Sequence, residues 1–380
     1  MTQPTFVLSP PLLLATDGSS GAHMAQTMVR PIAELLQALQ ASQENATPTA
    51  VLTVVTVQPR PRKRVTRSLK LVGKKPAGQP ADADSSATDP ALAGSAPEGA
   101  TTGAGGAAGL SLDQLTKLVQ ADFPSDFPLS VQVRQGQPAT EILNCARTIG
   151  ASLIVVGHRG VGGVRELLLG SVSTAIARYA PCSVLIARTR NHSVAVGLGH
   201  VLLVVDATFH DQQAFAMTRQ LAPAGIHTIT LLHIQPPLNA SYLVAPFTPR
   251  TPSWQLTQSL QEAQREQGEQ ILQTATTALA IPDLTVQTQL HTGDTGPSIC
   301  QVAEAIGANL IMMGSDPTRR SLLAPLQAMR QSHQNRSAVR ETADQPRPIL
   351  RNTRLSVTED YVIHYAPCPV LLCRATVATP

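Results

Sequence analysis

The sequence predicts an α/β protein made of two tandem, doubly wound domains, each with a five-stranded parallel sheet. Three observations point to this fold class. Short, almost continuous apolar runs recur along the chain, as expected for strands buried on both faces. Segments with helical spacing of apolar residues alternate with these runs, which is typical of a parallel sheet connected by helices. The same order of elements occurs twice, so the chain carries two copies of one unit.

The repeat can be aligned directly. Residues 136–157 align without a gap on residues 293–314. Further on, Tyr179-Ala180-Pro181-Cys182 corresponds to Tyr365-Ala366-Pro367-Cys368. Agreement in order over this length indicates two homologous domains rather than a chance similarity.

The start of each copy sets the domain limits. Each begins with an apolar strand that ends in an aspartate, Asp17 in the first copy and Asp206 in the second. We expect domain 1 at residues 1–190 and domain 2 at residues 200–380, joined near Asn191 to Gly199.

The elements of the first copy follow from local patterns. Strands are expected at residues 12–17, 50–58, 129–134, 152–157 and 183–188. The third alternates as Leu129-Val131-Val133, which predicts a half-buried strand. Helical spacing links Ala139, Ile142, Leu143, Ala146 and Ile149, and Ser111 with Gln114 predicts a capping box at the start of another helix. Pro31 lies inside the first helical pattern, where it predicts a kink.

Two segments fall outside this scheme. Residues 60–109 open with a cationic run and continue in Ala, Gly, Ser, Pro and Asp, which predicts a disordered insertion in domain 1. A second insertion, rich in arginine, covers about 317–354 in domain 2. Such basic blocks could tether an anionic partner. Neither carries interleaved aromatic residues, and runs of this kind are more often only solvated, so nucleic acid is not an expected partner.

Composition excludes several classes of protein. The 380 residues are 43% apolar with a net charge of +4, which is enough for two cores and weak evidence for an anionic surface as partner. Five cysteines form no CxxC pair, so neither a zinc site nor a disulfide framework is expected. Cys182 and Cys368 are expected to be small core residues. No apolar run approaches the length of a membrane span, and Phe6 to Ala15 makes a poor signal peptide, so a soluble cytoplasmic protein is expected.

One motif carries most of the functional information. Gly157-His158-Arg159-Gly160 follows an apolar strand, and Gly170-Ser171-Val172-Ser173 opens a helical pattern. Together they offer unpaired backbone N–H groups at the positive end of a helix, an arrangement that suits phosphate. Taken singly, the glycines could only form a tight turn, and Ser171 or Asp17 could only cap a helix. No phosphate loop with Gly-x4-Gly-Lys-Ser/Thr and no GxGxxG after the first strand is present.

The spacing Gly-x2-Gly-x9-Gly-Ser, followed by Tyr-Ala-Pro-Cys-Ser-Val-Leu-Ile, resembles the ATP-binding signature of the universal stress protein family. The resemblance implies a small doubly wound α/β fold that binds ATP or AMP, with Mg²⁺ an open addition beside ATP. It implies that Asp17 contacts adenine and that Val57 gives it backbone contacts. It implies that ribose and phosphates are held by Gly157, Gly160, Gly170, Ser171 and Val172, assisted by Ser173. Independently of the resemblance, His158 and Arg159 are hydrogen-bond donors at the loop tip and could reach an outer phosphate.

The second copy departs from the signature. Gly314 is kept, but Pro317 follows where the second glycine should stand. Ser356 and Val357 occupy the later Gly-Ser positions, and Glu359 stands where Ser173 does. Because a carboxylate there would repel phosphate, domain 2 is expected to have lost nucleotide binding.

Three hypotheses on function follow. The first is a nucleotide-responsive stress protein without a catalytic residue or metal site. Since the family pairs through its last strand, residues 183–188 and 369–374 would then make an intramolecular pseudo-dimer, with homo-oligomers still open. The second is a weak ATP hydrolase or phosphotransferase, and the third is a scaffold that does not bind nucleotide and uses its basic insertions as tethers.

Overall fold

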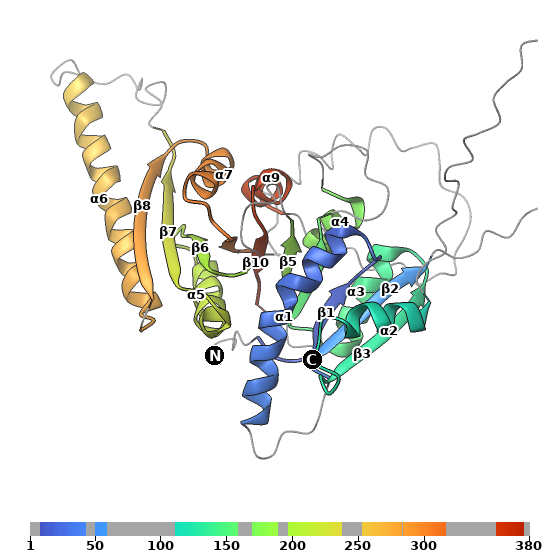
Figure 1. The fold of residues 1–380 in the computed structure, drawn as a ribbon. Helices are drawn as coiled ribbons and strands as arrows, with labels where there is room; N and C mark the ends of the chain where they lie inside the picture. The colour runs from blue at the N-terminus through green and yellow to red at the C-terminus, as the bar shows by residue number, and fades with distance from the viewer. Residues whose placement is uncertain are drawn as a thin grey trace, which may run out of the picture. The chain divides into compact units, whose positions relative to one another are not determined.

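The computed structural model describes residues 8–42, 50–58, 111–158, 169–188, 197–237, 253–282, 284–316 and 355–375 (Figure 1). Both predicted insertions, 60–109 and 317–354, lie outside the described residues. Most of the predicted junction between the domains does too.

The first half of the chain alternates strands and helices as predicted. Its elements are β1 (Leu12–Ala15), α1 (Ser20–Ala41), β2 (Leu52–Gln58), α2 (Leu112–Gln120), β3 (Leu129–Gln135), α3 (Pro138–Ile149), β4 (Leu153–Gly157), α4 (Ser171–Tyr179) and β5 (Ser183–Ala187). All five predicted strands are present, with ends that differ by at most two residues.

The second half repeats this order. Its elements are β6 (His200–Val204), α5 (Phe209–Leu221), the short 3₁₀ helix η1 (Ala222–Ala224), β7 (Thr228–Gln235), α6 (Ser253–Leu279), β8 (Thr285–Thr292), α7 (Thr295–Ala305), β9 (Leu310–Gly314), α9 (Val357–Tyr365) and β10 (Val370–Cys373).

The strands form a single ten-stranded sheet in the order β3-β2-β1-β4-β5-β10-β9-β6-β7-β8. Neighbours within each half are parallel. At the centre β5 pairs antiparallel with β10, with Leu185 opposite Leu371. The predicted pairing of residues 183–188 with 369–374 is therefore present, and it joins the two expected five-stranded sheets into one.

Local signals account for several elements. Ser111 and Gln114 form the predicted capping box of α2, in which the Ser111 Oγ accepts from the Gln114 N–H and the Gln114 side chain accepts from the Ser111 N–H. β3 is a half-buried edge strand, as its alternation predicts. Pro31 lies inside α1, which runs as one helix of 22 residues. At position 31 the helix therefore proceeds without a backbone N–H donor.

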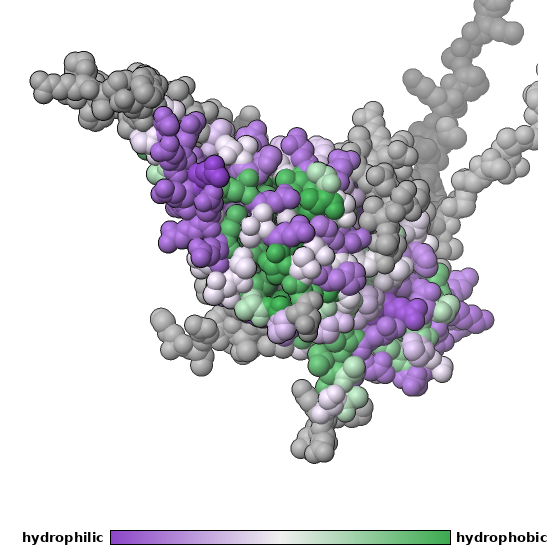
Figure 2. Space-filling model, turned by 60° about the vertical axis from the view of Figure 1, so that its left-hand side comes forward, coloured by the Kyte–Doolittle hydropathy of each residue, from purple (hydrophilic) through white to green (hydrophobic). Residues whose placement is uncertain are grey.

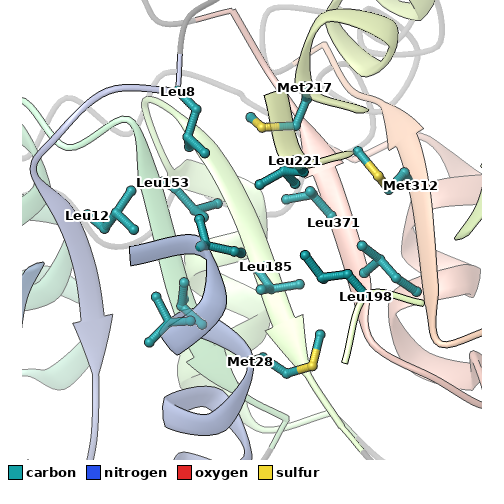
Figure 3. Close-up of a cluster of buried hydrophobic side chains, with 14 of the residues drawn as sticks. Leu8, Leu12, Met28, Leu153, Leu185, Leu198, Met217, Leu221, Met312 and Leu371 are labelled. Atoms are coloured by element: carbon teal, nitrogen blue, oxygen red, sulfur yellow. The ribbon is translucent and has the colours of Figure 1, made fainter. Parts of the chain in front are cut away.

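The sheet separates two apolar cores, and each core runs through both halves. One contains side chains of α1, α2, α5 and α6, the other side chains of α3, α4, α7 and α9. Figure 3 shows part of the first core, where side chains of the two halves meet around the central strands: Leu8, Leu12, Met28, Leu153, Leu185, Leu198, Met217, Leu221, Met312 and Leu371. The N-terminal segment adds a polar link, because the Leu8 N–H donates to the side chain of Gln220 in α5 at 2.7 Å.

The cysteines belong to these cores. Cys182 and Cys368 are buried and free, and burial raises the pKa of both thiols to about 12. A thiol with so high a pKa is a weak nucleophile at neutral pH. The expectation that these two residues are small core side chains is confirmed.

Some large apolar side chains remain at the surface. Figure 2 shows hydrophobic residues gathered on one face, with hydrophilic residues around them. Among the described residues, the most exposed large apolar side chain is Val357 at the start of α9, at 90%. A helix long and apolar enough to cross a membrane is absent from the described part of the chain.

We expect Leu185→Ala to lower the free energy of unfolding by about 2–5 kcal/mol, because it leaves a cavity in a core shared by both halves. Urea unfolding followed by circular dichroism measures the loss. Leu39→Ala is the control, since Leu39 is 51% exposed and its truncation should change stability by less than about 0.5 kcal/mol. Two separate transitions, with only one shifted by Leu185→Ala, would contradict a shared core.

Candidate functional site

The candidate site lies where the strand order of the first half reverses. β1 pairs with β2 on one side and with β4 on the other, all parallel. Ala15 is in register with Val55 of β2 and with Val156 of β4, so Asp17, Val57 and Gly157 come together at one edge of the sheet. In open α/β sheets, ligands bind in the crevice at such a reversal point.

Asp17 has a local structural task at this edge. Its side chain is exposed, and its Oδ1 accepts from the Ser19 N–H at 3.0 Å. Ser19 is the N-cap of α1, with its Oγ accepting from the Ala22 N–H at 3.2 Å. The second half repeats the turn, since Asp206 accepts from the Thr208 N–H at 3.0 Å. Shaping the turn into the first helix therefore accounts for both aspartates without a ligand.

Gly157 is required by packing. A Cβ atom at this position would lie 2.4 Å from the carbonyl carbon of Gly21, in the first turn of α1. The equivalent Gly314 stands in the same relation to α5, where a Cβ would lie 2.5 Å from the His210 oxygen. The close approach of helix to strand explains these glycines whether or not phosphate binds.

His158 ties the end of β4 to its surroundings. Its N–H donates to the Ala187 oxygen at 2.8 Å, and its own oxygen accepts from the Gly170 N–H at 2.9 Å. The residue is 8% exposed, so it lies in the interior at the end of β4. Its backbone bonds to β5 and to the start of α4 keep it in the interior. Arg159 and Gly160 lie outside the described residues.

The N-terminus of α4 faces the same edge of the sheet. Its N-cap is Gly170, which has no side chain with which to cap the helix, and the first turn contains no acidic residue. Ser171 is exposed and Val172 half-buried. Ser173 is buried and turns its Oγ to donate to the Gly157 oxygen at 2.6 Å. These four residues leave the positive end of α4 without a carboxylate of their own.

The equivalent helix α9 begins differently. The Ser356 Oγ accepts from the Glu359 N–H at 3.1 Å, and Glu359 Oε2 accepts from the Ser356 N–H at 2.5 Å. Glu359 is 5% exposed. A carboxylate from the chain itself therefore occupies the positive end of α9, as a capping box does.

The rest of the second-half edge is also acidic. His210 stands where the first half has Gly21, and its Nε2 lies 3.6 Å from the Asp316 carboxylate. Asp211 is 5% exposed, and burial together with the Asp206 carboxylate raises its pKa to about 7. Sequence comparison of the two halves singled out Glu359 but missed His210 and Asp211, although aligning Gly21-Ala22 with His210-Asp211 would have found them.

Comparison of the sequence with models of known protein families identifies the family of this chain. The model described as the universal stress protein family matches residues 10–188 and 197–333, one region for each half. The chain belongs to the universal stress protein family. Its two family regions are in tandem, as the repeat predicts.

Curated relatives match over short segments. Universal stress protein YxiE of Bacillus subtilis is 55% identical over 53 residues, which are 14% of this chain and 36% of that protein. Universal stress protein Slr1101 of Synechocystis is 36% identical over 78 residues, 20% of this chain and 72% of that protein. The matches to the first relatives span about a quarter to a third of those proteins.

Solved structures with a similar fold span both halves of the chain. A universal stress protein from Archaeoglobus fulgidus has a TM-score of 0.51 at 14% identity, covering 98% of both chains. A functionally unknown protein from Pseudomonas aeruginosa has a TM-score of 0.54 at 12% identity, covering 98% of this chain and 95% of that one. At such identities the likeness establishes the tandem fold of this universal stress protein and nothing about its ligand.

Metal ligands do not converge in the part of the chain that the structure describes. No group of three or more His, Cys, Asp or Glu side chains there could hold a metal ion. The acidic residues of the second-half edge interact instead with backbone N–H donors, with His210, or, for Asp206 and Asp211, with each other.

Asp211 predicts a dependence of stability on pH. Its pKa of about 7 in the folded protein lies above the ordinary 3.8, so its contribution to stability is complete below pH 4 and is lost as pH rises to about 7. Asp211→Asn removes this titration. The difference in free energy of unfolding between the variant and the wild type should therefore shift in favour of the variant as pH rises, by at most about 1.4 kcal/mol per pH unit.

Urea unfolding at pH 5, 6, 7 and 8 measures this difference. Asp113→Asn, at an exposed carboxylate of α2, is the matched control and should run parallel to the wild type. If Asp211→Asn also runs parallel, the carboxyl is ionised in the folded protein and the prediction is wrong.

Proposed function

We propose that the first half of this universal stress protein binds ATP or AMP, with the phosphates at the N-terminus of α4. On this proposal the protein is a nucleotide-responsive module for regulation or stress protection. The binding half and its partner half form an intramolecular pseudo-dimer through β5 and β10. The proposal is supported by the family membership of the chain together with the geometry at the reversal point of the first half.

The contrast between α4 and α9 carries the proposal. The two helices occupy equivalent positions, but α9 meets the carboxylate of Glu359 at its positive end, whereas α4 begins at Gly170 and turns Ser173 toward the Gly157 oxygen. Among the described residues, the chain thus supplies a carboxylate to the start of α9 and none to the start of α4, where an anion from solution would bind. Phosphate is the anion that helix N-termini beside a glycine-rich strand end most often bind.

Each part of the nucleotide is assigned on this basis. Asp17 and Val57 stand at the ends of β1 and β2, where the adenine would lie. Gly157, Gly160, Gly170, Ser171 and Val172 would surround ribose and phosphates. Ser173 would serve indirectly by fixing α4 to the end of β4, because its hydroxyl already donates to Gly157. The buried His158 would likewise support the loop, while Arg159 remains the candidate contact to an outer phosphate.

The second half would not bind nucleotide, for three reasons of charge and space. Glu359 takes the anion position, the His210 side chain stands where Gly21 leaves room, and Asp316 adds a further carboxylate beside it. Two of these groups would repel a polyphosphate, and the third would exclude it by volume.

We expect Ser171→Glu to lower the affinity for ATP at least about tenfold, because it puts a fixed carboxylate where the phosphates would bind. A Glu in the first turn also favours the helix, so the variant should fold. Val357→Glu is the matched control, since Val357 is the equivalent and exposed position of α9. Isothermal titration calorimetry with ATP and with AMP measures all three proteins.

Equal losses in both variants would point to a general charge effect. A wild type that binds neither nucleotide and carries none after purification would reject the proposal and leave the scaffold hypothesis.

A further inference from the structure

The two central strands each end in a buried arginine. Arg188 follows β5 and is 6% exposed, and Arg374 follows β10 and is 4% exposed. They occupy equivalent places in the repeat, nine residues after Tyr179 and Tyr365 respectively. Because β5 and β10 are antiparallel, each arginine lies beside the other half of the chain.

Arg374 crosses into the first half and holds the C-terminus of α4. Its Nη1 donates to the Ala180 oxygen at 3.2 Å and its Nη2 to the Ala177 oxygen. Its Nε donates to the Ser315 Oγ at 3.1 Å, at the end of β9 in its own half. Its backbone N–H donates to the Ser183 Oγ at 3.0 Å.

Arg188 does the reverse. Its Nη1 donates to the Ile363 oxygen of α9 at 3.2 Å, and Ile363 is the counterpart of Ala177. Each half thus contributes an arginine that donates to carbonyl groups near the C-terminus of the other half's final helix.

Local charges compensate the buried guanidinium of Arg374. Burial lowers its pKa, while the carboxylates of Glu359 and Asp316 act in the opposite direction. The carbonyl end of α4 contributes the negative pole of the helix dipole. Truncating one member of such a buried network leaves the other groups without a partner, which is strongly destabilising. The position of the Arg374 guanidinium is therefore strongly held.

The two ends of α4 are mechanically connected, because the helix has only nine residues. Its N-terminus is at the candidate phosphate site, and its C-terminus is held by Arg374. A second link to the same helix also comes from the second half: Arg178 of α4 forms an ion pair with Asp360 of α9 at 2.8 Å. The second half thus contacts the C-terminal turn of the helix whose first turn carries the N–H groups of the candidate site.

We propose that Arg374 is a positioning residue of the nucleotide site, through which the second half completes the site of the first. This inference rests on the proposed function and deepens it. It assigns the second half a task that requires no nucleotide of its own. Arg374 would act by holding α4 in place and would not itself contact the ligand.

The test compares Arg374→Met with Arg188→Met. Both remove a buried guanidinium from equivalent sites. The first removes the hydrogen bonds to Ala177 and Ala180 at the end of α4, and the second removes the hydrogen bond to Ile363 of α9. We expect Arg374→Met to weaken ATP binding about tenfold or more, as small misplacements of binding groups do, and Arg188→Met to change it less than about threefold. Hydrogen–deuterium exchange without nucleotide should be faster in α4 for Arg374→Met and faster in α9 for Arg188→Met.

A milder variant covers the case in which Arg374→Met fails to fold. Arg374→Lys keeps the charge but has no planar fork to bridge Ala177, Ala180 and Ser315, so it should show an intermediate loss of affinity and intermediate α4 exchange. Equal affinity losses at positions 374 and 188, or none at either, would overturn the inference. If the wild type binds no ATP, the proposed function fails, and exchange in α4 decides the positioning role: unchanged exchange in Arg374→Lys rejects it.

Discussion

The antiparallel pairing of β5 with β10 is the constraint on which the rest of the structure depends. These strands would otherwise be edges of two separate sheets, each with unpaired backbone groups and apolar side chains exposed to water. Their pairing makes one sheet of ten strands and extends both cores across the centre of the molecule. It also puts the final helix of each half within reach of the other, which the exchanged arginines use.

The same pairing explains how duplicated halves can diverge. Because the halves share both cores, each contributes to the stability of the other. On the proposed function, only the first half would need to keep a ligand site. The second half keeps the fold-defining features, the turn at Asp206 and the close packing at Gly314. At the start of α9 it has the carboxylate of Glu359, whereas the first turn of α4 contains no acidic residue. Glu359 does for α9 what a bound phosphate would do for α4, since it neutralises the positive end of the helix and accepts from a backbone N–H.

The site residues fall into two groups: those that a contact within the protein already explains, and those whose side chains make no such contact. Asp17, Gly157 and Ser173 are each explained by a turn, a close approach or a hydroxyl contact inside the protein. Gly170 contributes its backbone N–H to the His158 oxygen but has no side chain, and the side chain of Ser171 is exposed. On the proposed function, a change at the exposed Ser171 would separate binding from folding better than a change at Gly157, which packs on Gly21.

The sequence by itself determined the class of fold, the duplication, the strands and the anomaly at Glu359. The fold class and the strands follow from local periodicity and from the turn residues. The duplication and the anomaly at Glu359 follow from comparing the two halves of the sequence with each other. Only the tertiary structure decided that His158 is buried, that Gly157 packs on Gly21 and that Arg374 reaches α4. Those facts depend on contacts between segments far apart in the chain, whose distance and direction no local pattern encodes.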